Sequence, residues 1–321
     1  MTAGRAGAYP TGATYAEALQ NTALCFADPE LRGGRVAVTR LGLPRPISGA
    51  FASVFTVTSA DGGKFAVKCF TREVPDQAER YREISARLAE LDDAGLSQPW
   101  KMSFEYLTRG VLVNGHWYPV LKMGWVDGVN LSEWLEAHHR DAPAVHRLAG
   151  RFAALTGDLA GAGIAHGDLQ HGNLLVAPDG TLRLVDYDGM YVPALAGRKA
   201  TENGHRNYQS PRRTADDFGP DLDRFSAWLI HTSLVAISRE PDLWPTLHEP
   251  GGEYLLLTSE DFSAPAASAR FPSLLGHRDP AVRDLADRLG RLVDVALAAI
   301  PTPDAALAAA APPVPVPAAG P

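Results

Sequence analysis

The chain has 321 residues, of which 30 are basic and 37 acidic, so its formal net charge is −7. Hydrophobic residues make up 45% and charged residues 21%, which is typical of a globular protein and argues against wholesale disorder. The charge balance leaves no polybasic footprint for a nucleic acid. Two cysteines, Cys25 and Cys69, exclude a disulfide scaffold and a four-cysteine zinc site. The first six residues lack the apolar core of a signal peptide, and no apolar run approaches about 18 residues, so we expect a cytoplasmic protein without a membrane segment.

The N-terminal part of the chain is predicted to be rich in strands. Residues 1–34 are expected to form an N-terminal extension with one short helix, from about Tyr15 to Phe26. The predicted strands cover residues 36–38, 52–58, 65–70, 110–113 and 116–123. A helical spacing of apolar residues lies between Asp76 and Leu91. Residues 35–123 are therefore expected to form a β-rich lobe.

The rest of the chain is predicted to be mostly helical. The predicted helices cover residues 131–138, 145–162, 223–238 and 282–300. Two short strands, Leu174–Val176 and Leu182–Val185, flank a Pro-Asp-Gly turn. Residues 301–321 are almost entirely Ala, Pro and Val, which predicts a disordered tail. The expected fold is α+β and bilobal, with the helical lobe over residues 124–300.

The sequence His-Gly-Asp-Leu-Gln-His-Gly-Asn at residues 166–173 carries the strongest chemical signal. Asp168 stands five residues before Asn173, which is the catalytic-loop spacing of phosphoryl-transfer enzymes. In that chemistry the aspartate orients the attacking hydroxyl and accepts its proton, while the asparagine amide oxygen binds magnesium. The alternative is a polar turn that uses Asp and Asn as turn formers.

A second carboxylate motif, Val-Asp-Tyr-Asp-Gly, occupies residues 185–189. Asp186 ends a predicted strand, which is where kinase-like folds hold their principal magnesium ligand. Magnesium prefers hard oxygen donors and keeps few protein ligands, so Asp186 and Asn173 would suffice beside substrate phosphates. Asp188 would either approach a second metal or cap the turn. This motif favours phosphoryl transfer over a simple polar turn.

Lys68 lies inside an apolar predicted strand, where an unpaired ammonium group is costly. It matches the strand lysine that pairs with the α- and β-phosphates of a nucleotide. Glu83 on the following helix is its expected partner, because the apolar residues beside Glu83 face inward; Glu79, one turn earlier, is the alternative. Upstream, a turn of small residues keeps one glycine of a phosphate-binding loop, Gly49, with Phe51 at its tip.

Together these motifs resemble the eukaryotic-like protein kinase superfamily. From about residue 46 to residue 300 the chain looks like a little-characterised bacterial branch with a His-Gly-Asp catalytic loop. The resemblance implies ATP and Mg²⁺ as cofactors, Met123 as gatekeeper, and a hinge at residues 124–127 that binds adenine. It makes Tyr208–Pro211 the end of the activation segment and Asp223 the residue that holds the backbone of the catalytic loop. The nucleotide-binding residues that it adds are Val54, Ala66, Met123, Gly124, Trp125, Val126, Asp127 and Leu175.

Three residues depart from the protein kinase pattern. Gly167 replaces the usual arginine of His-Arg-Asp, Gln170 replaces a lysine, and Arg212 replaces a glutamate. The first two make the loop similar to small-molecule kinases of the aminoglycoside phosphotransferase type. The leading hypothesis is a Ser/Thr protein kinase that phosphorylates a hydroxyl acceptor. The alternatives are a small-molecule kinase and a pseudokinase scaffold that binds nucleotide or a partner without transfer.

The missing arginine also bears on regulation. In many protein kinases that arginine pairs with a phosphate on the activation segment through charge-assisted hydrogen bonds. Gly167 has no side chain to form this clamp. We therefore expect the active arrangement to form without phosphorylation of the segment, Thr201 included, with control by a regulatory partner protein or by expression.

Overall fold

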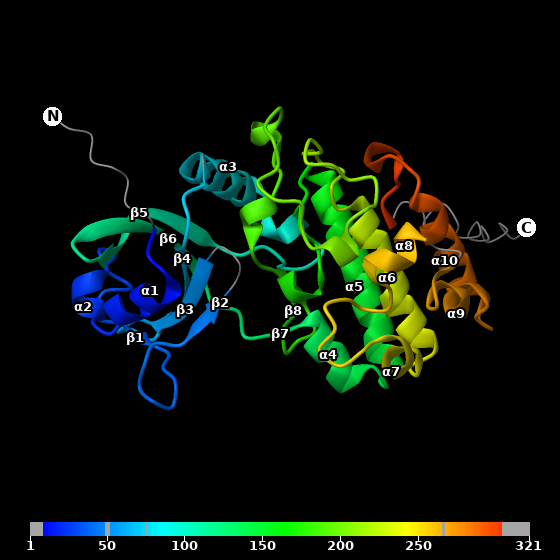
Figure 1. The fold of residues 1–321 in the computed structure, drawn as a ribbon, viewed down its shortest axis with the longest axis horizontal. Coiled ribbons are helices and arrows are strands. Elements are labelled where there is room, and N and C mark those ends of the chain that lie inside the picture. The colour runs from blue at the N-terminus through cyan, green and yellow to red at the C-terminus, as the bar shows by residue number, and fades with distance from the viewer. Residues whose placement is uncertain (1–8, 49–51, 75, 265–266, 304–321) are drawn as a thin grey trace, which may run out of the picture. The chain divides into compact units, whose positions relative to one another are not determined.

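The computed structural model describes residues 9–48, 52–74, 76–264 and 267–303 (Figure 1). By its internal contacts the chain divides into two compact units. Unit 1 comprises residues 1–90 and 101–127, and unit 2 comprises residues 91–100 and 128–321. Unit 1 is built around an antiparallel sheet and unit 2 mainly of helices, so the predicted α+β composition is confirmed.

The described part of unit 1 contains a six-stranded antiparallel sheet of order β1-β3-β4-β6-β5, with β2 also paired to β3. Its strands are β1 (Arg35–Val36), β2 (Pro46–Ser48), β3 (Ala52–Thr58), β4 (Lys64–Phe70), β5 (Phe104–Val113) and β6 (His116–Gly124). The β5–β6 hairpin turns at Asn114 and Gly115, which both have positive φ as a tight hairpin requires. The predicted strands at 52–58, 65–70 and 116–123 are confirmed, whereas the prediction did not include β2.

The N-terminal segment packs into the core of unit 1. Helices α1 (Gly12–Ala18) and α2 (Thr22–Cys25) both contact β5. The prediction of one helix from Tyr15 to Phe26 is wrong, because a continuous helix would turn Cys25 away from the face that carries Tyr15 and Leu19, and all three are buried. The Tyr15 hydroxyl donates a hydrogen bond to the carbonyl of Phe70 at 2.7 Å. The segment therefore forms part of the unit rather than a peripheral arm.

Helix α3 (Gln77–Glu90) completes unit 1 and confirms the predicted helix. Its buried face carries Tyr81, Ile84 and Leu88, spaced three or four residues apart, and Tyr81 packs against the rings of Phe104 and Tyr106 on β5.

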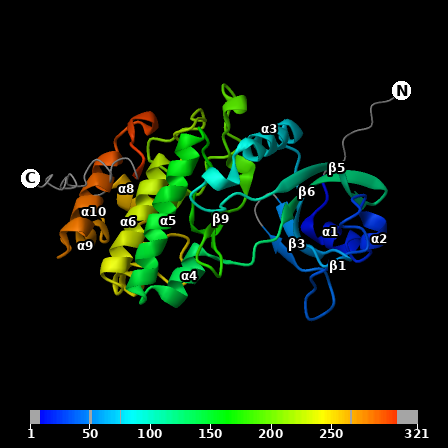
Figure 2. The same cartoon turned by 180° about the vertical axis from the view of Figure 1, so that it is seen from behind.

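Unit 2 is organised around long packed helices and a small sheet. Its α-helices are α4 (Leu131–His138), α5 (Ala142–Gly161), α6 (Arg224–Arg239), α7 (Leu243–Leu247), α8 (Ser259–Ser263), α9 (Phe271–Leu275) and α10 (Pro280–Leu292). The strands β7 (Val129–Asn130), β8 (Leu174–Val176) and β9 (Leu182–Leu184) form an antiparallel sheet in that order. Helix α6 packs against both α5 and α10, as the two opposite views show (Figures 1 and 2). Four short 3₁₀ segments lie near the loops of interest: η2 (His171–Asn173), η3 (Tyr187–Gly189), η4 (Pro193–Leu195) and η5 (Arg206–Tyr208).

Residues 91–100 belong to unit 2 because Asp158 on α5 holds them there. Its Oδ2 accepts hydrogen bonds from the backbone N–H and hydroxyl of Ser97, at 2.9 and 2.6 Å, and from the indole N–H of Trp100 at 3.0 Å. The Trp100 side chain is fully buried. The Gln98 amide also donates to the carbonyl of Arg151 on α5 at 2.8 Å, so both contacts anchor the segment to this helix.

The predicted helix over 282–300 is too long. Helix α10 ends at Leu292; a short 3₁₀ segment, η7 (Leu297–Ala299), follows, and side chains of α6 hold the residues around it. Arg224 donates to the carbonyls of Ala298 and Ile300, each at 2.8 Å, and Trp228 donates to that of Pro301 at 2.8 Å. The predicted tail continues into residues 304–321, which lie outside the described residues. Within the described ranges, every helix is too short or too polar to cross a lipid bilayer.

Candidate functional site

The loop at residues 166–173 connects α5 to β8 in unit 2, and its backbone is fixed at both ends. Before the loop, Ala165 and Tyr191 exchange backbone hydrogen bonds of 3.1 and 2.8 Å. Beyond it, the N–H of Val185 donates to the carbonyl of Asn173 at 3.1 Å. The segment that carries Asp186 therefore lies beside the segment that carries Asn173.

The carboxylate of Asp168 is held by two hydrogen bonds. Its Oδ1 accepts from the backbone N–H of His205 at 2.6 Å, and its Oδ2 accepts from the Asn173 amide nitrogen at 3.0 Å. The same nitrogen donates to the Asp168 carbonyl at 2.9 Å. Both amide hydrogens of Asn173 are thus used, and its amide oxygen is directed away from Asp168. The structure therefore brings together the two side chains that the sequence singles out by their five-residue spacing, through a contact that the sequence analysis did not predict.

Asp223, the residue before α6, accepts hydrogen bonds from the backbone of the loop. Its Oδ1 accepts from the N–H of Gly167 at 2.9 Å, and its Oδ2 accepts from the N–H of His166. Burial raises the pKa of Asp223, although nearby His166, these two N–H groups and nearby Arg213 act to lower it. The expected contact between Asp223 and the loop backbone is therefore present, between residues more than 50 positions apart.

Gly167 occupies a position that excludes a side chain. Its φ is +80°, and a Cβ atom there would lie 2.1 Å from the carbonyl oxygen of Gly189 and 2.8 Å from the carbonyl carbon. Both obstacles are backbone atoms, which cannot move aside as a flexible side chain could. An arginine at position 167 is incompatible with this arrangement, so the departure from His-Arg-Asp has a steric cause.

Asp186 adopts a left-handed conformation, with φ 65° and ψ 73°. Such a conformation costs a non-glycine residue about 1–2 kcal/mol and is concentrated at functional sites. The ring of Tyr187, the next residue, packs edge-on against the buried ring of His166, with centroids 5.9 Å apart. The Nε2–H of His166 in turn donates to the carbonyl of Val185 at 2.9 Å. The aspartate is therefore displayed by a tightly packed turn, and its own side chain is exposed.

The oxygens of Asn173 and Asp186 suit magnesium, which prefers hard donors and completes its octahedron with phosphates and water. In the described ranges, three or more His, Cys, Asp or Glu side chains nowhere gather into a metal-binding group. A site made of one carboxylate, one amide and substrate phosphates does not require such a group. The donor set therefore fits Mg²⁺ and does not fit a structural zinc site.

The rings of His171, His205 and Tyr208 form a cluster near Asp168. The Tyr208 hydroxyl and Nδ1 of His171 form a hydrogen bond of 2.7 Å. Burial lowers the pKa of His171 to about 4, with nearby His205 acting in the same direction, so this ring is neutral near pH 7. Nδ1 of His205 accepts from the N–H of Asn207, so its Nε2–H faces a carboxylate oxygen of Glu253 at 3.3 Å. The sequence analysis assigned no role to His171 or His205, although His171 lies within the 166–173 motif and His205 lies in the run Gly-His-Arg-Asn-Tyr at residues 204–208.

In unit 1, the strand register brings several predicted nucleotide-binding residues together. Buried Lys68 on β4 lies between Val54 on β3 and Leu121 on β6, and Ala66 lies opposite Met123. These side chains therefore occupy neighbouring positions in the centre of the sheet.

Glu83 on α3 is half-buried and forms an ion pair with the adjacent Arg82 at 2.9 Å. Glu79, the alternative partner for Lys68, lies 3.8 Å from the same arginine. The pairing of Lys68 with either glutamate stays a prediction. Gly49 and Phe51 lie outside the described residues.

The predicted hinge residues end unit 1. The N–H groups of Gly124 and Trp125 donate to the carbonyls of Ser103 and Lys64, at 3.1 and 3.0 Å. The Trp125 indole donates to Asp127 at 2.9 Å, and the Lys64 ammonium lies 4.2 Å from the centre of its ring. A nucleotide at this segment would therefore have to use its carbonyls or the N–H of Val126. Leu175, the last predicted contact, lies on β8 in unit 2.

A comparison with models of protein families finds no match, and neither does a comparison with curated proteins. The functional argument therefore rests on the residues themselves: a carboxylate held by an amide and a backbone N–H, and a second carboxylate displayed on a left-handed turn.

Proposed function

We propose that the chain is an ATP- and Mg²⁺-dependent phosphotransferase with the bilobal fold of the protein kinase superfamily. The observation that carries the proposal is the geometry around Asp168. Its carboxylate is oriented by Asn173 and by the His205 N–H, and the backbone of Asn173 is hydrogen-bonded to Val185, the residue before Asp186. A simple polar turn would need neither this arrangement nor the strained conformation of Asp186. ATP as the phosphoryl donor places the proposed activity in the cytoplasm.

In the proposed mechanism, Asp168 accepts a hydrogen bond from the acceptor hydroxyl, aligns its oxygen with the γ-phosphorus and takes up its proton. Asn173 and Asp186 would hold Mg²⁺, which neutralises charge on the phosphate oxygens. Lys68 would contact the α- and β-phosphates, and the backbone at Gly49 would approach them. Phosphoryl transfer depends mainly on positioning and charge neutralisation, and these residue types supply both.

The acceptor is a hydroxyl on a protein or on a small molecule. Gln170, one of the two residues that favour a small molecule, accepts a hydrogen bond from the N–H of Gly172 at 2.7 Å. Its side chain therefore shapes the loop, and the lysine-to-glutamine difference has a structural explanation. This weakens the case for the small-molecule alternative, and we propose a protein acceptor, a serine or threonine hydroxyl.

The test is Mg²⁺-dependent ATP consumption by the purified chain, with Asp168→Asn as the matched variant. Loss of a general base lowers the rate by roughly 10²–10⁴-fold, so we expect the variant to be at least about 100-fold slower. The exposed Asp216→Asn variant, which loses only a surface pair with Lys199, should match the wild type. Equal rates for Asp168→Asn and wild type would favour the pseudokinase scaffold.

A further inference from the structure

Arg213 makes a contact with the catalytic loop that the proposed mechanism does not use. Its Nη1 donates to the carbonyl of Gly167 at 2.7 Å and also to the side-chain oxygen of Gln209. The Gly167 carbonyl belongs to the peptide bond that precedes Asp168. Arg213 therefore acts directly on the backbone that positions the proposed base.

The segment that carries Arg213 lies against the loop along several residues. A Cβ at Gly204 would fall 2.8 Å from the Gly167 oxygen and 2.9 Å from Oδ1 of Asp168, so the two backbones are in close contact. The next residue, His205, donates its N–H to that same Oδ1. Residues 204–213 thus contact both the Gly167 carbonyl oxygen and Oδ1 of Asp168.

The charges around Arg213 match this role. Burial lowers the pKa of the guanidinium, but the carboxylates of Asp223, Asp168, Asp217 and Glu202 act in the opposite direction. An arginine stays protonated in a protein, so its bond to the Gly167 carbonyl is charge-assisted. Because Gly167 has no room for a side chain, an arginine can reach this place only from another segment.

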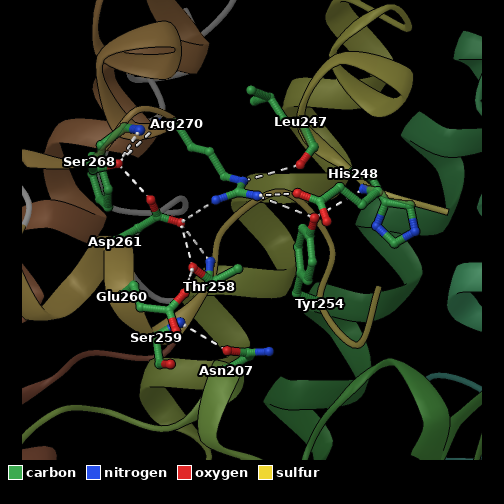
Figure 3. A network of polar contacts seen from close by, with 12 residues as sticks. Asn207, Leu247, His248, Tyr254, Thr258, Ser259, Glu260, Asp261, Ser268 and Arg270 are labelled. Atoms are coloured by element: carbon green, nitrogen blue, oxygen red, sulfur yellow. Dashed lines mark hydrogen bonds and ion pairs between the residues drawn. The ribbon is translucent and has the colours of Figure 1, made fainter. Parts of the chain in front are cut away.

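The segment itself is anchored to the helices that follow it. The Asn207 amide donates to the carbonyl of Glu253 at 3.0 Å and accepts from the N–H of Ser259 at 3.0 Å. Ser259 opens α8, whose cap is closed by Thr258 and buried Asp261 (Figure 3). Each of these contacts is formed by side chains and backbone of the chain itself.

We propose that Arg213 is a positioning residue that orders the catalytic loop through the Gly167 carbonyl, in place of an arginine within the loop and without a phosphate on the activation segment. This inference rests on the proposed function for its catalytic consequence. It goes beyond that function by naming the side chain that makes the loop independent of phosphorylation.

The test compares Arg213→Gln and Arg213→Lys with Arg212→Gln, each on phosphatase-treated protein. Arg212 is the matched control because it is the adjacent arginine, is exposed, and among the described residues forms its ion pair with exposed Asp294 at 3.2 Å. Two quantities are measured: the kcat and KM for ATP, and the amide hydrogen exchange of residues 166–173. Thermal unfolding confirms that each variant is folded.

We expect Arg213→Gln to lower kcat at least ten-fold while the KM for ATP changes less than two-fold, because the nucleotide contacts are elsewhere. Exchange in residues 166–173 should rise at least ten-fold. Arg213→Lys keeps a charged donor, so its kcat should be at least three-fold higher than that of Arg213→Gln. Arg212→Gln should match the wild type in both measurements. Unchanged exchange and unchanged kcat in Arg213→Gln would overturn the inference, as would a loss of wild-type activity on phosphatase treatment.

The two proposals fail separately. A wild-type chain without Mg²⁺-dependent ATP turnover would refute the phosphotransferase, while hydrogen exchange would still decide whether Arg213 orders the loop.

Discussion

Two groups of charged side chains, one in each unit, show how a structural charge differs from a proposed catalytic one. In unit 1, Lys122 on β6 contacts Asp28 at 2.9 Å, Glu30 at 2.8 Å and Glu105 at 3.0 Å. The ammonium has three donors and meets three carboxylates, so its hydrogen-bonding capacity is filled. In unit 2, Asp168 is held by one amide and one backbone N–H, which leaves further lone pairs on its oxygens.

The difference lies in what holds each charge. Burial acts to lower the pKa of Lys122, but the hydrogen bonds that it donates to Glu30, Asp28 and Glu105 outweigh burial and raise that pKa. These partners fix the N-terminal segment to β5 and β6 and leave the ammonium no free donor. Asp168 is oriented by neutral donors. Among the described residues, no basic side chain forms an ion pair with it at 4 Å or less, so its charge is not neutralised. A charge that is positioned but not paired can act on a substrate.

The largest expected effect concerns the displayed carboxylate. Asp186→Asn should lower Mg²⁺-dependent phosphoryl transfer by roughly 10³-fold, since charge stabilisation by a bound metal is worth several kcal/mol. Asp188→Asn is the comparison, because Asp188 would either bind a second metal or only cap the turn. A small effect there would favour the cap, and equal losses would favour a second metal. Full activity of Asp186→Asn would contradict the magnesium assignment.

The paired cluster in unit 1 should respond in stability rather than activity. Lys122→Met leaves the carboxylate of Asp28, only 8% exposed, without its partner. Breaking a buried pair in this way costs about 3–5 kcal/mol, measurable by urea unfolding. The control is Lys64→Met, which removes a more exposed pair with Asp127 and should cost less than about 1 kcal/mol. Equal effects of the two substitutions would show that the cluster is not a structural anchor.

Gly167→Ala tests the steric limit on the catalytic loop. The new Cβ would meet the Gly189 backbone, so we expect a loss of about 2–4 kcal/mol from strain and displacement together. Gly197→Ala is matched in φ, at +82° against +80°, but a Cβ there has nothing within 4 Å. It should cost only about 1 kcal/mol. Similar unfolding free energies for both variants would mean that the loop yields more readily than the contact distances imply.

Much of this organisation could be predicted from the sequence, and the rest depends on contacts between distant residues. Helices α3 and α4 and the β3–β4 hairpin follow from apolar periodicity and turn residues, and Asp168 and Asn173 are singled out by their five-residue spacing. The His205 N–H on Asp168 joins residues 37 apart, and the Lys122 partner Asp28 is 94 residues away. No local pattern encodes such pairs. The role of Arg213 was equally hidden: it follows Arg212 and the Tyr208–Pro211 motif in the sequence, but its contact with Gly167 spans 46 residues.

The smallest expected effect is a pH dependence of stability. The pKa of His171 is about 4 in the folded chain against an ordinary value of 6.5, so below pH 6.5 the unfolded chain takes up a proton that the folded chain does not. The unfolding free energy should therefore fall as pH drops from 6.5 toward 4. His171→Gln, which keeps a hydrogen-bonding group for Tyr208, should reduce this fall by about 1 kcal/mol between pH 6.5 and 5.5. His116→Gln, at an exposed hairpin position, serves as the control, and identical slopes for all three proteins would contradict the buried neutral ring.

The most direct test of the phosphotransferase proposal follows the γ-phosphoryl group itself. The chain is incubated with γ-labelled ATP, Mg²⁺ and a cell lysate, and label on protein is separated from label on small molecules, with Asp168→Asn in parallel. The proposal predicts label on serine or threonine of protein that requires both Mg²⁺ and Asp168. Label on a small molecule would keep the phosphotransferase and change its acceptor. If none of the phosphoryl transfer depends on Asp168, the proposal is contradicted.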